Sequence, residues 1–168
     1  MKKVVKFGGS SLANSDQFRK VGEIIRSEES RRYVVPSAPG KRFPEDTKVT
    51  DLLYACYNKA AAGEDFSREL KEISDRYYEI IRGLELSLSL EEEFQQIEKD
   101  FKAQAGTDYA ASRGEFLNGK IMAAYLGFEF IDAASVLRFD KNGNFDADKT
   151  DSLLAKRLAK CERAVIPG

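Results

Sequence analysis

The stretch VVKFGGSS, residues 4–11, places a short run of β-branched and aromatic side chains directly before two glycines. After it, residues 14–28 carry apolar side chains at helical spacing, so the order predicts a strand, a glycine turn and a helix. Residues 33–35 (Tyr-Val-Val) form a second apolar run, which the segment PSAPG at residues 36–40 closes. A strand, helix, strand order with a continuously apolar second strand favours a parallel sheet.

The rest of the chain is mostly helical by pattern. Apolar side chains at helical spacing in residues 66–84 and 90–101 predict an antiparallel pair of helices. Thr50 is placed to cap the helix that follows it, and Ser89 with Glu92 has the spacing of a capping box. Further elements are predicted as helices at 107–126 and 148–160, strands at 128–131, 136–139 and 164–166, and a hairpin turn at Asn142-Gly143. We expect one α/β domain in which residues 63–106 form a helical insertion.

Composition excludes several classes of function. Among 168 residues, 27 lysines and arginines balance 28 aspartates and glutamates, which removes any whole-chain electrostatic argument for binding nucleic acid or a membrane surface. The chain has no histidine, so Ser-His-Asp and Cys-His catalysis and the usual zinc sites are excluded, and no metal ligands are expected. The amino terminus is far less apolar than a signal peptide or a membrane span. We therefore expect a cytoplasmic protein in which Cys56 and Cys161 are free thiols.

The glycine turn is the most informative place for chemistry. Glycines let backbone amides approach an anion, and the amino end of the following helix adds positive potential. Lys6 precedes the glycines on the strand, whereas a Walker A loop places its lysine after them. A turn of this kind is common in α/β proteins, so by itself it leaves specific phosphate binding open.

Four motifs in order along the chain resemble aspartate kinases, members of the amino acid kinase superfamily. They are KFGGSS at residues 6–11, SAPG at 37–40, VTDLL at 49–53 and SRGE at 112–115. The resemblance covers essentially the whole chain and implies a three-layer α/β sandwich of the amino acid kinase (carbamate kinase-like) type, with a mainly parallel sheet between helices. It also implies that the nucleotide-binding remainder and regulatory domains of such enzymes lie outside this chain, which we expect to be truncated.

The same resemblance implies roles for seven residues. Lys6 is expected to be the catalytic cation, and the phosphate and ATP site is expected to comprise Lys6, Gly8, Gly9 and Ser10. The substrate site is expected to comprise Ser37, Thr50 and Glu115, with Glu115 receiving an ammonium group. Taken without the resemblance, Ser37 could simply turn the chain, Thr50 could only cap a helix, and Glu115 could be a solvated charge. Arg113 is left out of the site, because neighbouring helix residues do not share a face.

The implied activity is the phosphorylation of the side-chain carboxylate of L-aspartate by ATP with Mg²⁺, the first step towards lysine, threonine and methionine. An aspartate side chain of pKa about 3.9 is already ionised at neutral pH, so the reaction needs no general base. We expect a homo-oligomer at full length and little or no turnover from these residues alone. Two alternatives stay open: a kinase of the same fold acting on glutamate or an acetylated amino acid, and a non-catalytic anion-binding module.

Overall fold

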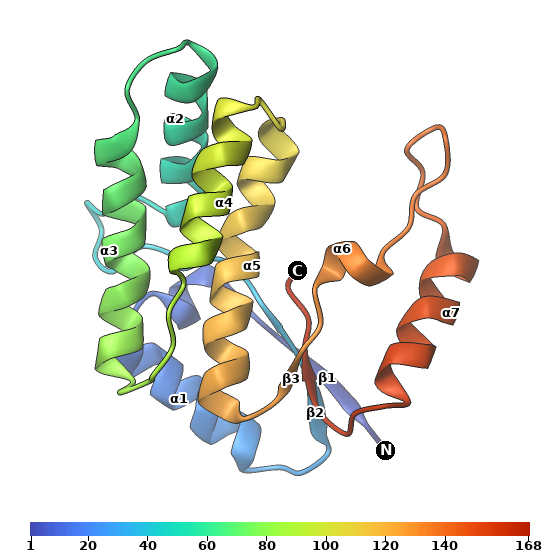
Figure 1. The fold of residues 1–168 in the computed structure, drawn as a ribbon. Helices are drawn as coiled ribbons and strands as arrows, with labels where there is room; N and C mark the ends of the chain where they lie inside the picture. The colour runs from blue at the N-terminus through green and yellow to red at the C-terminus, as the bar shows by residue number, and fades with distance from the viewer.

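A four-stranded parallel sheet forms the centre of the molecule (Figure 1). The computed structural model describes all residues from 1 to 168. The strands lie in the order β1-β2-β4-β3, with bounds β1 (Lys3–Phe7), β2 (Arg31–Pro36), β3 (Glu129–Phe130) and β4 (Ala164–Val165). Every pairing is parallel, so the carboxyl ends of all four strands lie at one edge of the sheet.

The predicted strand, glycine turn, helix and second strand are confirmed. A short 3-10 helix, η1 (Gly9–Leu12), follows β1 and leads into α1 (Ser15–Arg26). The Asn14 side chain begins α1 by accepting a hydrogen bond from the Gln17 amide at 3.0 Å. The helix then returns the chain to β2, which pairs with β1 along its whole length and brings both strand ends to the same place.

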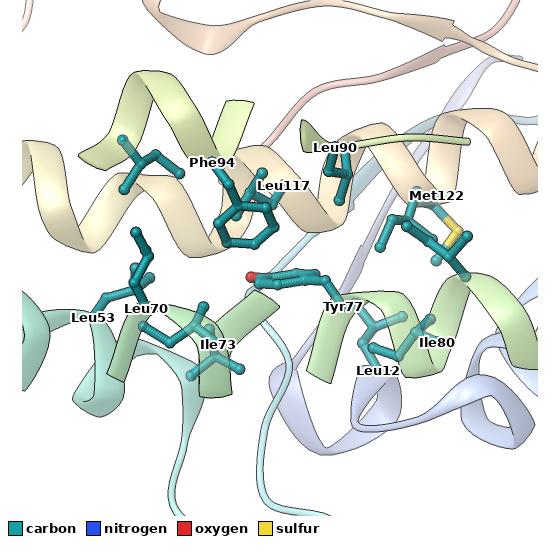
Figure 2. Close-up of a cluster of buried hydrophobic side chains, with 14 of the residues drawn as sticks. Leu12, Leu53, Leu70, Ile73, Tyr77, Ile80, Leu90, Phe94, Leu117 and Met122 are labelled. Carbon is teal, nitrogen blue, oxygen red and sulfur yellow. The ribbon is translucent and has the colours of Figure 1, made fainter. Parts of the chain in front are cut away.

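Four long helices form a bundle on one side of the sheet: α2 (Val49–Ala61), α3 (Ser67–Gly83), α4 (Glu91–Lys102) and α5 (Thr107–Leu126). They run alternately up and down, which confirms the predicted antiparallel pair (Figure 1). Figure 2 shows how Tyr77 and Ile80 of α3 meet Leu90, Phe94 and Met122 in one core. Strand residues such as Val34 and Val165 belong to the same core, so α3 and α4 pack as part of the domain. The description of residues 63–106 as an insertion stays a prediction.

The other face of the sheet carries α6 (Ala133–Val136) and α7 (Ala147–Leu158), opposite the helices α2 to α5 (Figure 1). A second, smaller core of Tyr33, Ile131 and Val136 lies on this side. The fold is therefore a parallel sheet between two layers of helices, as the resemblance implies. None of the helices combines the length and the apolar character that crossing a bilayer would require.

The strand predicted at residues 136–139 and the capping box predicted at Ser89 are wrong. Residues 136–139 do not form a strand: the Asp132 side chain accepts a hydrogen bond from the Ala134 amide at 3.0 Å and begins α6 instead. Only a single bridge joins Phe139 to Phe145, around a turn in which Gly143 has a φ of +82°. The capping box at Ser89 does not form either, because α4 begins at Glu91 and its capping position is Leu90.

Candidate functional site

Two loops cross at the carboxyl ends of β1 and β2. The Ser37 amide donates to the Phe7 carbonyl oxygen at 3.0 Å, and the Gly40 amide donates to the Gly9 carbonyl oxygen at 2.8 Å. A Cβ atom on Gly40 would lie 2.6 Å from the carbonyl carbon of Gly9, and a Cβ on Gly9 would lie 2.8 Å from the Ala38 carbonyl oxygen. Because these neighbours are backbone atoms, the close crossing of the loops requires glycine at both positions.

Gly40→Ala tests this crossing. We expect the substitution to lower the free energy of unfolding by about 2–3 kcal/mol, because the new methyl group overlaps backbone that cannot move independently. Gly8→Ala is the matched control, since a Cβ at Gly8 meets nothing within 4 Å and its φ is −77°. Urea unfolding of both variants measures the difference. Equal stabilities would contradict the close approach of the two loops.

A pocket of about 450 Å³ lies at this crossing. Five of the seven predicted site residues line it: Gly9, Ser10, Ser37, Thr50 and Glu115. The other lining residues are Ala38, Pro39, Gly40, Lys41 and Lys48. Side chains and backbone from the glycine turn, the 37–40 loop, α2 and α5 therefore meet in one place, although they are spread over more than a hundred residues of sequence.

Thr50 lines the pocket, but it does not cap α2 as the sequence predicts. The helix α2 begins at Val49, two residues earlier than a cap at Thr50 requires, and the capping position Lys48 makes no side-chain hydrogen bond to the helix. The prediction of Thr50 as a cap is wrong. Its side chain instead lies in the first turn of α2, half-buried at the wall of the pocket.

Glu115 is the only acidic side chain that lines the pocket. Burial raises the pKa of its carboxyl group above the ordinary value, and the charge of Lys6 partly opposes this rise. The folded protein therefore binds the Glu115 proton more tightly than the unfolded chain does, and the ionised form costs stability as the pH rises through the raised pKa. A bound cation beside Glu115 would relieve that cost.

Lys6 and Gly8 do not line the pocket, although they are close in sequence to Gly9 and Ser10, which do. Lys6 is exposed on β1, two residues before the glycine pair begins at Gly8, and its charge acts on Glu115. Gly8 is also exposed and supplies the carbonyl oxygen to which the Ser11 amide donates at 3.0 Å. The two residues thus lie outside the pocket lining, on the strand and turn that lead to Gly9 and Ser10.

Two neighbours of the site were not predicted from the sequence. Asn118 is fully buried on α5 and donates from Nδ2 to the Ser37 carbonyl oxygen at 2.7 Å, which fixes the 37–40 loop. Asn118 lies three residues after Glu115 and therefore on a similar face of α5. This spacing is the one feature of the sequence that could have identified Asn118 as a neighbour of the site. Arg113, which the sequence left out, stacks its guanidinium on the rings of Tyr109 and Phe116 and does not line the pocket.

The pocket offers groups suited to a small amino acid. Glu115 can receive an ammonium group, hydroxyls of Ser10, Ser37 and Thr50 can donate to carboxylates, and Lys41 and Lys48 add positive charge at the rim. No group of three or more His, Cys, Asp or Glu side chains is arranged to hold a metal ion. A larger depression of about 680 Å³ lies over α3 and is lined only by charged side chains, which include the ion pairs Arg42–Glu79 and Lys71–Asp75.

The sequence of residues 1–167 matches the family model described as the amino acid kinase family. The chain belongs to this family. Within the amino acid kinase family it is 40% identical to "Aspartokinase 3" of Bacillus subtilis over 140 residues, which are 80% of this chain and 31% of that protein.

Solved structures agree with this membership of the amino acid kinase family. The crystal structure of Clostridium acetobutylicum aspartate kinase matches all of this chain and 39% of its own, with a TM-score of 0.95 and 49% identity. Escherichia coli aspartokinase III in complex with aspartate and ADP matches with a TM-score of 0.78 at 24% identity, which supports the fold alone. The resemblance to aspartate kinases and the amino acid kinase fold are therefore confirmed, and the chain spans about a third of the length of these relatives.

Proposed function

We propose that the whole protein is an aspartate kinase, which transfers the γ-phosphoryl group of ATP to the side-chain carboxylate of L-aspartate. The observation that carries the proposal is the pocket in which Glu115 faces the hydroxyl-bearing residues Ser10, Ser37 and Thr50 at the glycine turn. Glu115 would pair with the ammonium group and the hydroxyls with the carboxylates, so each charge of aspartate has a partner. The Clostridium acetobutylicum aspartate kinase, which is 49% identical, supports this substrate.

The reaction needs positioning and charge neutralisation more than proton transfer. A side-chain carboxylate oxygen of aspartate attacks the γ-phosphorus, the bond to the bridging oxygen breaks, and ADP leaves with the electron pair. Lys6 would stabilise the negative charge on the transferring group, and the amides of the Gly8–Ser10 turn would donate to phosphate oxygens.

Magnesium enters the proposal only as the companion of ATP. Mg²⁺ is commonly held by one or two carboxylates together with substrate phosphates, and it would neutralise phosphate charge when bound. The residues of this chain form no cluster of ligands for it. We therefore assign none of them to Mg²⁺.

A substrate panel tests the function. We expect the whole protein with ATP to phosphorylate L-aspartate at a kcat/KM at least tenfold above that for L-glutamate, because one extra methylene changes selectivity by about 10–200-fold. N-acetyl-L-aspartate should be at least a hundredfold poorer, because it would leave the Glu115 carboxylate without a cation. Trapping the acyl phosphate with hydroxylamine measures the product. A preference for glutamate or an acylated amino acid would identify another kinase of this family, and no product with any acid would favour a non-catalytic module.

We also propose that the protein works in the cytoplasm and as a homo-oligomer at full length. Cys56 and Cys161 are both free thiols, which suits a reducing compartment. Burial raises the pKa of Cys56 to about 12, so this thiol is unreactive at neutral pH.

A further inference from the structure

Arg76 of α3 is a charged residue buried in the protein. Its relative exposure is 4%, and it lies three residues from Ile73 and four from Ile80, on the apolar face of the helix. A buried guanidinium is stable only when its donors are used. All the partners of Arg76 lie in one segment, residues 40–48, which we call the substrate loop.

Arg76 joins the two ends of the substrate loop. Nη2 donates to the Gly40 carbonyl oxygen at 2.8 Å, and Nη1 donates to the Thr47 carbonyl oxygen at 2.7 Å. Nη1 also pairs with Asp46 Oδ2 at 3.2 Å. One planar, rigid guanidinium group therefore holds both ends of a loop that has no helix or strand of its own.

Asp46 extends the same network inside the loop. The side chain of Asp46 has 8% relative exposure and accepts hydrogen bonds from the amide and the Nε of Arg42, each at 2.9 Å. The hydrogen bond from Arg42, together with the charge of Arg76, holds the pKa of Asp46 well below its usual range in spite of burial. Asp46 is thus ionised at all physiological pH values, and the network does not depend on pH there.

The network reaches the pocket through Gly40. Its carbonyl oxygen is held by Arg76, while its amide is held by the Gly9 carbonyl oxygen in the glycine turn. Lys41 and Lys48, at the two ends of the substrate loop, line the pocket, and Thr50 follows two residues later. A loop released from Arg76 would therefore move Gly40, Lys41 and Lys48, which all line the pocket. It would also weaken the contact between Gly40 and Gly9 where the two loops cross.

The neighbour of Arg76 on α3 acts on the opposite wall. The hydroxyl group of Tyr77, which is fully buried, donates to the Gly114 carbonyl oxygen at 2.7 Å, directly before Glu115. Figure 2 shows the Tyr77 ring in the core between α3 and the helices that face it. Two consecutive residues of α3 thus tie this helix to both walls of the pocket.

We propose that Arg76, paired with Asp46, is a positioning residue that holds the substrate loop in the form that binds the amino acid. The proposal rests on the aspartate kinase function. In this proposal α3 does not contact the substrate, but it raises substrate affinity because its Arg76 holds the substrate loop. Nothing in the local sequence motifs marks Arg76 for this role.

Trypsin cleavage tests the loop directly, because Lys41, Arg42 and Lys48 are cleavage points within it. We compare Arg76→Met and Arg76→Lys with Arg82→Met, an exposed arginine of the same helix that makes no hydrogen bond or ion pair with the loop. Cleavage of a loop follows the population of its open form, so Arg76→Met should be cut there at least tenfold faster. Arg76→Lys keeps the charge but loses the fork and should fall between wild type and Arg76→Met. Arg82→Met should match the wild-type protein.

Steady-state kinetics of the whole protein give the functional readout. Arg76→Met should raise KM for aspartate about tenfold, change KM for ATP less than twofold, and be partly rescued by Arg76→Lys. If Arg76→Met does not fold, Asp46→Asn replaces it, with the same expected cleavage and KM changes. Unchanged cleavage of the loop, or KM values for aspartate and ATP that rise together, would overturn the proposal. A wild-type protein that shows no aspartate kinase activity would overturn the proposed function alone, and the cleavage rates would still decide whether Arg76 holds the loop.

Discussion

Lys6→Met is expected to lower kcat of the whole protein by about a thousandfold, while KM for aspartate changes less than threefold. Removal of one preorganised group that stabilises developing charge costs about 10²–10³ in kcat, and a full positive charge beside the phosphate turn belongs at the upper end. Lys6 lies on β1 outside the lining of the pocket, so the amino acid alone should hardly sense its loss. Methionine keeps an unbranched, flexible side chain of similar bulk and removes the ammonium group with its charge and its N–H donors.

The measurement is the initial rate of acyl phosphate formation at saturating ATP. Lys20→Met is the matched control, because Lys20 is an exposed lysine of α1 without an ion pair and lies outside the site. It should retain wild-type kcat. A Lys6→Met enzyme within tenfold of wild-type kcat would show that Lys6 does not act on the transferring group.

Glu115→Gln is expected to weaken aspartate binding at least a hundredfold and, at neutral pH, to raise the melting temperature slightly. The loss of affinity follows from the missing charge-assisted bond to the ammonium group and the amide dipole left in its place. The gain in stability follows from the raised pKa of Glu115, since burial makes the ionised carboxylate costly.

The sign of the pH dependence distinguishes this explanation from simple repacking. The folded-state pKa of Glu115 lies above its unfolded value, so its ionisation costs no stability at pH values below both. The stability advantage of Glu115→Gln should therefore shrink as the pH falls through the raised pKa, and it should vanish once the pH is well below about 4. Aspartate binding by the wild-type protein should weaken over the same range, because the protonated carboxyl group no longer attracts the ammonium group. Glu23→Gln, at an exposed position of α1, should show neither effect. A Glu115→Gln variant that binds aspartate normally would remove Glu115 from the site.

The first part of the fold was predictable from the sequence because each signal there is local. Asn14 caps α1 within its own turn, and the glycines of the turn stand directly after an apolar strand. The failures also have local causes. At Thr50 and Ser89 a side chain suited to capping lies one or two positions away from the residue where the helix actually begins. The pattern of apolar residues predicts that a helix is present more reliably than it predicts the residue at which the helix begins.

The candidate site was predictable in part for a different reason. The sequence motifs identified three substrate-site residues, Ser37, Thr50 and Glu115. These residues meet in one pocket because of the strand order and the helix packing, which no single motif contains. Arg76 and Asn118 were missed because their partners are backbone carbonyl oxygens 29 or more residues away in sequence. Such bonds leave no pattern in a sequence beyond a polar residue at an apolar-face position.

The most direct test of the central claim is a titration of the ¹⁵N-labelled chain with L-aspartate, followed by amide chemical shifts. This measurement detects even millimolar binding, so it does not require the complete enzyme. We predict saturable shifts centred on the amides of Gly9, Ser10, Ser37, Thr50 and Glu115, and their loss in Glu115→Gln. Shifts confined to the charged depression over α3, or equal shifts in both proteins, would contradict the assignment of this pocket to aspartate.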